Sequence, residues 1–120
     1  MSNVWENNIL LVKADWLVHN IYRVVRNFPA NERFGITSQI CRASLSIVLN
    51  IIEGYSRFGQ KEHIRFLEIS FGSAKETHYL IEFCFQEKLV KKDDYDILLG
   101  LINEVEKMLY SKLKTLRGKS

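Results

Sequence analysis

The chain has few residues that break helices or cross-link a fold. Its 120 residues include one proline, at position 29, six scattered glycines and two cysteines. Cys41 and Cys84 are far apart in the sequence and lie in apolar contexts, so we expect free thiols in a reducing compartment rather than a disulfide. No linker, repeat or low-complexity tract interrupts the sequence, which indicates a single domain over residues 1–120.

Long apolar runs are also missing. No run approaches the roughly 20 residues that cross a membrane. The N-terminal stretch MSNVWENN lacks the basic start and apolar stretch of a signal peptide. Apolar residues make up 47% and charged residues 26% of the chain, as in soluble globular proteins. We therefore expect a cytoplasmic protein with no membrane partner.

Residue patterns typical of catalysis and metal binding are absent too. No glutamate is followed three residues later by histidine, as di-iron bundles require, and His19, His63 and His78 lack metal-ligand spacing. The sequence has no Gly-rich phosphate loop. A Cys–His pair is formally available with Cys41 or Cys84, but a thiol on an apolar face is usually inert. We expect a non-enzymatic protein with no catalytic residue, no metal and no cofactor.

What the sequence does have is a helical period of apolar residues in four long segments. Short breakers separate them, which favours an all-α fold, an antiparallel up-down-up-down four-helix bundle. The first helix is predicted from about Val4 to Asn27, the second from a Thr37 cap to near Gly54, the third from about Gln60 to Leu89, and the fourth after VKKD with Asp93 or Asp94 in its first turn.

The second helix is apolar over an unusually wide arc. At 100° per residue its apolar side spans roughly 200°, whereas a helix in a monomeric bundle needs a stripe of only about 100°. Either a second copy of the chain or other parts of the same subunit must cover the surplus, and we favour a second copy. The expected oligomer interface consists of Leu45, Val48, Leu49 and Ile52.

The remaining side of this helix is a narrow polar stripe formed by Gln39, Arg42, Ser46, Asn50, Glu53 and Arg57. In one interpretation the stripe is the solvated side of the helix. In the other, Asn50 and Glu53 are hydrogen-bonded to the third helix or to a neighbouring subunit, with an arginine close to the carboxylate. Arg57 is four residues after Glu53. For Gln39, Ser46, Asn50 and Glu53 we favour a structural role over catalysis.

The third helix contains SFGSAKE, with Gly72 in a position that costs about 1 kcal/mol relative to alanine. Close approach of another helix would explain the small residues; a partly unwound turn is the alternative.

The segments FPANERFGITSQICRASLSIVLNIIEG and FLEISFGSAKE resemble the four-helix-bundle proteins encoded in intervening sequences of bacterial 23S rRNA genes, some of which are labelled ribosomal proteins. The similarity runs from about Trp16 to Leu116. The chain departs from the family pattern at Cys41, where arginine is usual, and at Val48 and Leu49, where proline and alanine are usual. The resemblance implies a left-handed bundle and a ring-like homopentamer. It also implies kinship with accessory proteins of diversity-generating retroelements, which bind nucleic acid and a reverse transcriptase.

The C-terminal segment after Glu106 has five basic residues and no acid: Lys107, Lys112, Lys114, Arg117 and Lys119. They suit a helix C-terminus and solubility. They also suit phosphate binding together with Arg42 and Arg57, since five subunits at +3 would carry +15. The main hypothesis is an oligomer that binds RNA or DNA through phosphates. The alternative is a protein-partner adaptor or ribosome-associated factor without nucleic-acid contact. No aromatic platform accompanies these charges, so base stacking is not expected.

Overall fold

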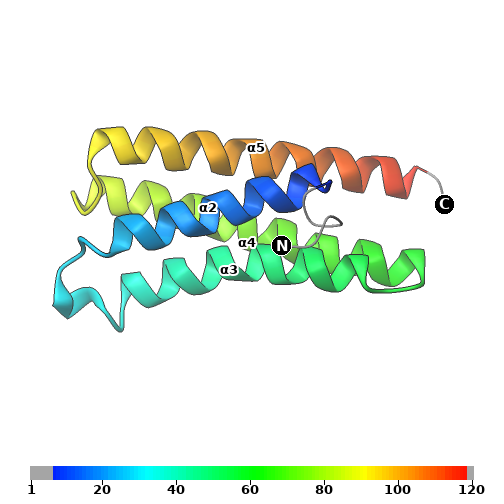
Figure 1. Ribbon diagram of the computed structural model, residues 1–120, viewed down its shortest axis with the longest axis horizontal. Coiled ribbons are helices and arrows are strands. Elements are labelled where there is room, and N and C mark those ends of the chain that lie inside the picture. Colours follow the sequence, from blue (N-terminus) through cyan, green and yellow to red (C-terminus); the bar gives the residue numbers. More distant parts are fainter. Residues whose placement is uncertain (1–6, 119–120) are drawn as a thin grey trace.

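The computed structural model describes residues 7–118, and within them it has four α-helices, one short 3-10 helix and no β-strand. The elements are α2 (Ile9–Val25), η1 (Ala30–Glu32), α3 (Ile36–Tyr55), α4 (Gln60–Gln86) and α5 (Lys92–Arg117). The four helices lie side by side, and successive helices run in opposite directions (Figure 1). Each helix packs against the next in sequence, α5 packs back on α2, and α3 and α4 pack most extensively. The all-α prediction is confirmed.

The helix ends differ from the predicted ones where local bonds decide them. The α2 helix begins at Ile9, because the Asn8 side chain accepts a hydrogen bond from Leu11 N at 3.1 Å; Val4, the predicted start, lies outside the described residues. The prediction of Thr37 as a cap is wrong. The 3-10 turn feeds directly into α3, which begins at Ile36 with Gly35 as its N-cap.

The α4 helix ends three residues before the predicted Leu89. Lys88 adopts a left-handed conformation with φ of 64°, and the N–H of Leu89 donates to the carbonyl of Cys84 at 2.9 Å. This bond closes the last turn in the way that Schellman caps do. The next helix, α5, carries Asp93 and Asp94 in its first turn as predicted, where the helix dipole favours acids. None of the helices in the described part of the chain combines the length and apolarity that a membrane span needs.

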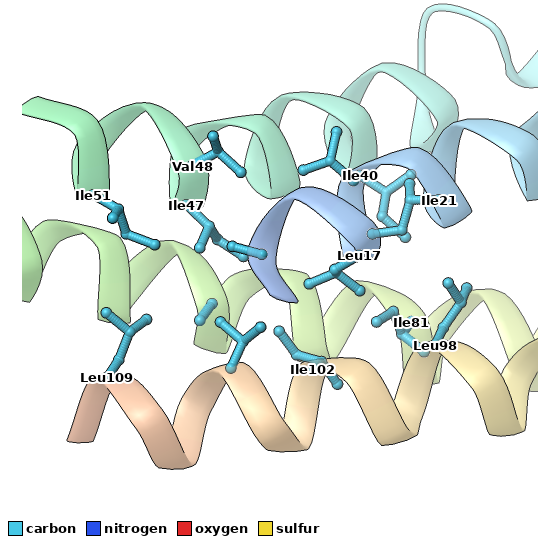
Figure 2. Close-up of a cluster of buried hydrophobic side chains, with 14 of the residues drawn as sticks. Leu17, Ile21, Ile40, Ile47, Val48, Ile51, Ile81, Leu98, Ile102 and Leu109 are labelled. Atoms are coloured by element: carbon cyan, nitrogen blue, oxygen red, sulfur yellow. The ribbon is translucent and has the colours of Figure 1, made fainter. Parts of the chain in front are cut away.

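The core fills the centre of the bundle along its length. Figure 2 shows isoleucines of α3 meeting Leu17 and Ile21 of α2 and Leu98, Ile102 and Leu109 of α5. These side chains are almost fully removed from solvent. Burial of a side chain of this size contributes about 1.5–3 kcal/mol, so the apolar stripes that predict the helices also hold them together.

Small residues set the close packing of α3 on α4. The hydroxyls of Ser46 and Ser73 are 2.9 Å apart, and the Ser70 hydroxyl donates to the Ile47 carbonyl at 2.8 Å. The SFGSAKE segment is continuous helix, so the unwound-turn alternative is wrong. Close approach holds for its serine and alanine. It does not hold for Gly72, where an added Cβ would meet no atom within 4 Å.

Candidate nucleic-acid interface

Two segments that are far apart in sequence meet at one end of the bundle. The α3–α4 connection and the C-terminal turns of α5 both lie at the right-hand end of Figure 1. The Gln60 side chain donates to the carbonyl of Leu116 at 2.9 Å, which ties the start of α4 to the end of α5. Lys112 Nζ lies 5.7 Å from the centre of the Tyr55 ring. We call this region, residues 53–68 and 107–117, the basic end.

The basic end differs in charge from the opposite end of the molecule. It carries seven lysines and arginines against three glutamates. The opposite end, residues 23–35 and 82–96, carries six basic and six acidic residues. The modest net charge of the chain is therefore concentrated at one end, where a polyanion would be attracted.

The predicted phosphate-binding residues at this end fall into two groups. Arg57 pairs with Glu53 at 2.7 Å and lies 4.8 Å from the centre of the Phe66 ring, and Arg117 pairs with Glu68 of α4. The exposed lysines Lys107, Lys112 and Lys114 form no ion pair with any carboxylate of residues 7–118. These lysines can therefore bind phosphates without breaking an ion pair. The two arginines would first have to leave their glutamate partners.

Arg42 does not belong to this group. It is exposed on α3, thirteen residues before the helix ends at Tyr55, which places it roughly 20 Å along the axis from that end at 1.5 Å per residue. Lys119 lies outside the described residues. Arg42 was predicted to bind phosphates together with Arg57 and the C-terminal basic residues, but the structure places it away from them.

The polar stripe of α3 lies partly against α4 and partly in solvent. Ser46 contacts Ser73, and the Asn50 amide donates to Ser46 on its own helix, at 2.9 Å to the carbonyl and 3.0 Å to the hydroxyl. Gln39 and Glu53 are exposed. The interpretation that Asn50 and Glu53 bond to the next helix is therefore wrong within the described residues, because Asn50 bonds to Ser46 and Glu53 pairs with Arg57 four residues later. Ser46 is the stripe residue that contacts α4, and the exposed members of the stripe fit the solvated interpretation.

The predicted oligomer interface is divided in a similar way. Val48 is 8% exposed and belongs to the core, and Ile52 is half-buried against it. Leu45 and Leu49 remain 39% and 53% exposed. The subunit itself covers Val48 and much of Ile52, because both pack with the hydrophobic core. Of the four predicted interface residues, Leu45 and Leu49 are the two that present a large apolar side chain to solvent.

The thiols and imidazoles are structurally engaged. Burial raises the pKa of the Cys84 thiol to about 12 and also raises that of Cys41, whose hydrogen bond with Tyr22 acts in the opposite direction. His63 Nδ1 lies 2.7 Å from the Gly54 carbonyl, and His78 Nδ1 lies 2.8 Å from Glu106 Oε1. Among residues 7–118, no three His, Cys, Asp or Glu side chains gather as a metal site would require.

The expectation that no aromatic platform accompanies the charges is wrong. The turn after α3 presents Phe58, which is fully exposed, and Tyr55 is 44% exposed. Both line a shallow hollow of about 280 Å³ together with Gln60, His63 and Leu116. The signal was in the sequence, since YSRF places two aromatic residues around Arg57. It was missed because only the fold brings this turn beside Lys112.

Three comparisons with known proteins place this geometry in context. The family model described as 23S rRNA-intervening sequence protein matches residues 6–111. A crystal structure of a protein of unknown function from the S23 ribosomal protein family of Bacteroides thetaiotaomicron is also similar, with a TM-score of 0.79 and 25% sequence identity. That similarity covers 88% of this chain and 99% of the other. No curated protein matches the chain.

Proposed function

We propose, because this chain belongs to the family of 23S rRNA-intervening sequence proteins, that it is a non-enzymatic oligomeric scaffold that binds RNA or DNA through phosphates at its basic end. The observation that carries the proposal is the uneven charge of the bundle, with seven basic against three acidic residues at one end and equal numbers at the other. Binding of this kind neutralises phosphates without reading sequence.

Lysines without partners suit this task. Lys107 and Lys114 are seven residues apart and therefore lie on the same exposed face of α5, while Lys112 reaches toward Tyr55. A lysine that forms no ion pair has no ion pair to break when it meets a phosphate. Its binding then gains from the release of counterions from the nucleic acid.

Self-association would strengthen such binding. Leu45 and Leu49 expose apolar surface on α3 that a second copy would cover. The resemblance to the family implies a homopentamer, in which five basic ends would act on one polyanion. Several weak phosphate-binding sites on one particle bind far more tightly than one.

A protein-partner adaptor is the second candidate function. Ile69 and Tyr79, on the outward side of α4, are 42% and 66% exposed and lie on either side of Gly72 in sequence. Exposed apolar and aromatic residues of this kind occur at the centres of protein interfaces. A protein partner bound there would leave the basic end without a role.

A salt titration of a labelled RNA hairpin and a DNA duplex, followed by fluorescence anisotropy, tests the main proposal. Affinity should fall steeply with salt, and the triple variant Lys107→Gln, Lys112→Gln, Lys114→Gln should flatten the slope by about 0.9 for each lost contact on duplex DNA. The control variant Lys88→Gln, Lys91→Gln, Lys92→Gln removes the same charge from the opposite end. This control variant should lose much less affinity for the two probes. Absence of binding to either probe at about 50 mM salt would overturn the proposal, as would equal losses in the two variants.

A further inference from the structure

We infer that the basic end binds single-stranded nucleic acid, with an unpaired base stacked on the ring of Phe58. This inference rests on the proposed function and adds the form of nucleic acid that the site selects. It depends on Phe58, on the hollow beside it and on the lysines around both.

Phe58 has no role in the fold of the subunit. Its side chain is fully exposed in the connection between α3 and α4, and no ring or cation within residues 7–118 contacts it. The neighbouring guanidinium of Arg57 lies over Phe66 instead. Both faces of the Phe58 ring are therefore open. Burial of an aromatic ring is favourable, and an exposed ring does not gain this free energy. A ligand that covers the Phe58 ring would therefore bind with an added favourable free energy.

The surroundings of Phe58 match the chemistry of a nucleotide. Tyr55 lines the same hollow, with His63 packed edge-on against its ring at 4.8 Å and Lys112 at 5.7 Å from its centre. Lys61 follows Phe58 by three residues and is exposed. An aromatic face beside free lysines is the combination by which proteins hold single strands: bases stack on rings while cations follow the backbone.

A single strand fits this arrangement better than a duplex. In a duplex each base face is covered by its neighbours in the stack, so only phosphates could reach the basic end. A base in a single strand or a loop can leave its neighbours at a cost of a few kcal/mol at most and cover the ring of Phe58. Stacking should therefore add affinity for single strands and none for duplex DNA.

The opposite end of the bundle supplies an internal comparison. Phe34 is also exposed, at 89%, but the Arg33 guanidinium lies 5.6 Å from its ring centre and the charges around it balance. A base would have to displace Arg33 from one face, and no excess of basic residues would hold its phosphates. Phe34 is therefore the matched control for Phe58, since both are exposed phenylalanines in connections between helices.

The test compares binding of an oligothymidine of about 12 nucleotides, within the range of known single-strand sites, with binding of a DNA duplex at low salt. The variants are Phe58→Ala, Phe58→Trp and Phe34→Ala. Loss of one stacked base corresponds to about a 5- to 150-fold weakening of single-strand binding. We expect this loss of single-strand affinity for Phe58→Ala and not for Phe34→Ala. Phe58→Trp should retain single-strand affinity, and duplex affinity should be unchanged in Phe58→Ala. Photocrosslinking of an oligonucleotide carrying 5-iodouracil should label Phe58.

The outcomes separate this inference from the proposed function. If Phe58→Ala binds single strands as well as the wild type, or loses no more than Phe34→Ala, the stacking inference is wrong. The phosphate proposal then stands as long as the lysine variants lose binding. If neither single strands nor duplex bind, the proposed function fails and the inference fails with it. Equal losses of single-strand and duplex binding in Phe58→Ala would also contradict stacking.

Discussion

Gly54 of α3 lies close to His63 and Phe66 in the first turns of α4. A Cβ added there would meet the His63 carbonyl oxygen at 3.3 Å, His63 Nδ1 at 3.4 Å and Phe66 Cβ at 3.4 Å. Two of these atoms belong to a histidine fixed by its hydrogen bond to the Gly54 carbonyl. A side chain at this position would therefore require His63 to shift by a few tenths of an ångström.

The variant pair Gly54→Ala and Gly100→Ala tests this role. Gly100 lies inside α5 with no atom within 4 Å of an added Cβ, so alanine should stabilise the protein there by up to about 1 kcal/mol. At Gly54 the same stabilisation by alanine should be offset by the cost of displacing His63 and Phe66. Chemical denaturation followed by circular dichroism measures both. Equal stabilisation by the two substitutions would show that α4 moves aside freely.

The two thiols should respond differently to an alkylating reagent. Only the thiolate reacts, and Cys84, fully buried with its pKa raised to about 12, should remain unlabelled in the folded protein. Cys41, half-buried with a raised pKa, should react slowly and faster as pH rises. Iodoacetamide labelling followed by peptide mass spectrometry measures both rates. Rapid labelling of Cys84 without unfolding would contradict its burial.

The raised pKa of Cys84 also makes stability depend on alkaline pH. The unfolded thiol ionises around its ordinary value of 9.0, whereas the folded thiol keeps its proton to about 12. The folded state therefore binds more protons in that range, and the contribution of this group to stability is lost as pH rises from 9 toward 12. In Cys84→Ala this part of the alkaline loss should disappear. An unchanged profile would show that other groups cause the decline.

At the scale of elements, α4 and α5 share a buried acid. Glu106 of α5 is 7% exposed, and its carboxylate lies 2.8 Å from His78 Nδ1 and 3.2 Å from Lys75 Nζ, both on α4. The position was not predicted, because a glutamate in an otherwise apolar stripe reads as a surface residue. A buried carboxylate needs such partners, since its removal from water costs several kcal/mol.

Removal of one partner should therefore cost more than removal of the pair. His78→Leu leaves Glu106 with Lys75 alone and should destabilise the protein by about 2 kcal/mol. The double variant His78→Leu, Glu106→Leu replaces the pair with apolar side chains and should be more stable than the single variant. Lys75→Gln, at a mostly exposed side chain, should cost less than about 1 kcal/mol. Guanidinium denaturation gives all three values. A double variant weaker than His78→Leu would contradict this account.

At the scale of the whole molecule, one side of α3 packs in the core of the subunit and another side faces outward. Val48 and Leu49 are neighbours in sequence, yet one belongs to the core and the other is 53% exposed. The 100° turn between adjacent helical residues places them on different sides of the helix. An oligomer formed through this helix would use Leu45 and Leu49.

Aspartate substitutions at these neighbours should have different consequences. Val48→Asp buries an unpaired charge and should unfold the subunit. Leu49→Asp should keep the helical circular dichroism spectrum while lowering the particle mass toward 14.1 kDa. Light scattering of the wild type should give about five times that mass. A wild-type monomer at micromolar concentration would contradict the proposed oligomer, and an unchanged mass in Leu49→Asp would show that another face forms the contacts.

The sequence by itself determined the number and the approximate positions of the helices in the described chain. The period of 3.6 residues and the breakers around Pro29, Gly59 and Val90 depend only on local geometry. Ends that depend on a particular hydrogen bond, such as the left-handed Lys88 after α4, were missed by a few residues. The pairing of Glu53 with Arg57 also follows from local spacing.

The tertiary structure alone decided which surfaces are covered and which segments meet. A helical wheel gives the direction of each side chain but not the neighbouring element that covers it. The wheel therefore placed Val48 and Leu49 in one apolar arc, although the packed bundle buries only Val48 of the two. In the same way, Phe58 and Lys112 are 54 positions apart in the sequence, and only the antiparallel course of the four helices brings them to one end. The candidate site is a product of that topology, because Phe58 comes from the α3–α4 connection and Lys112 from α5.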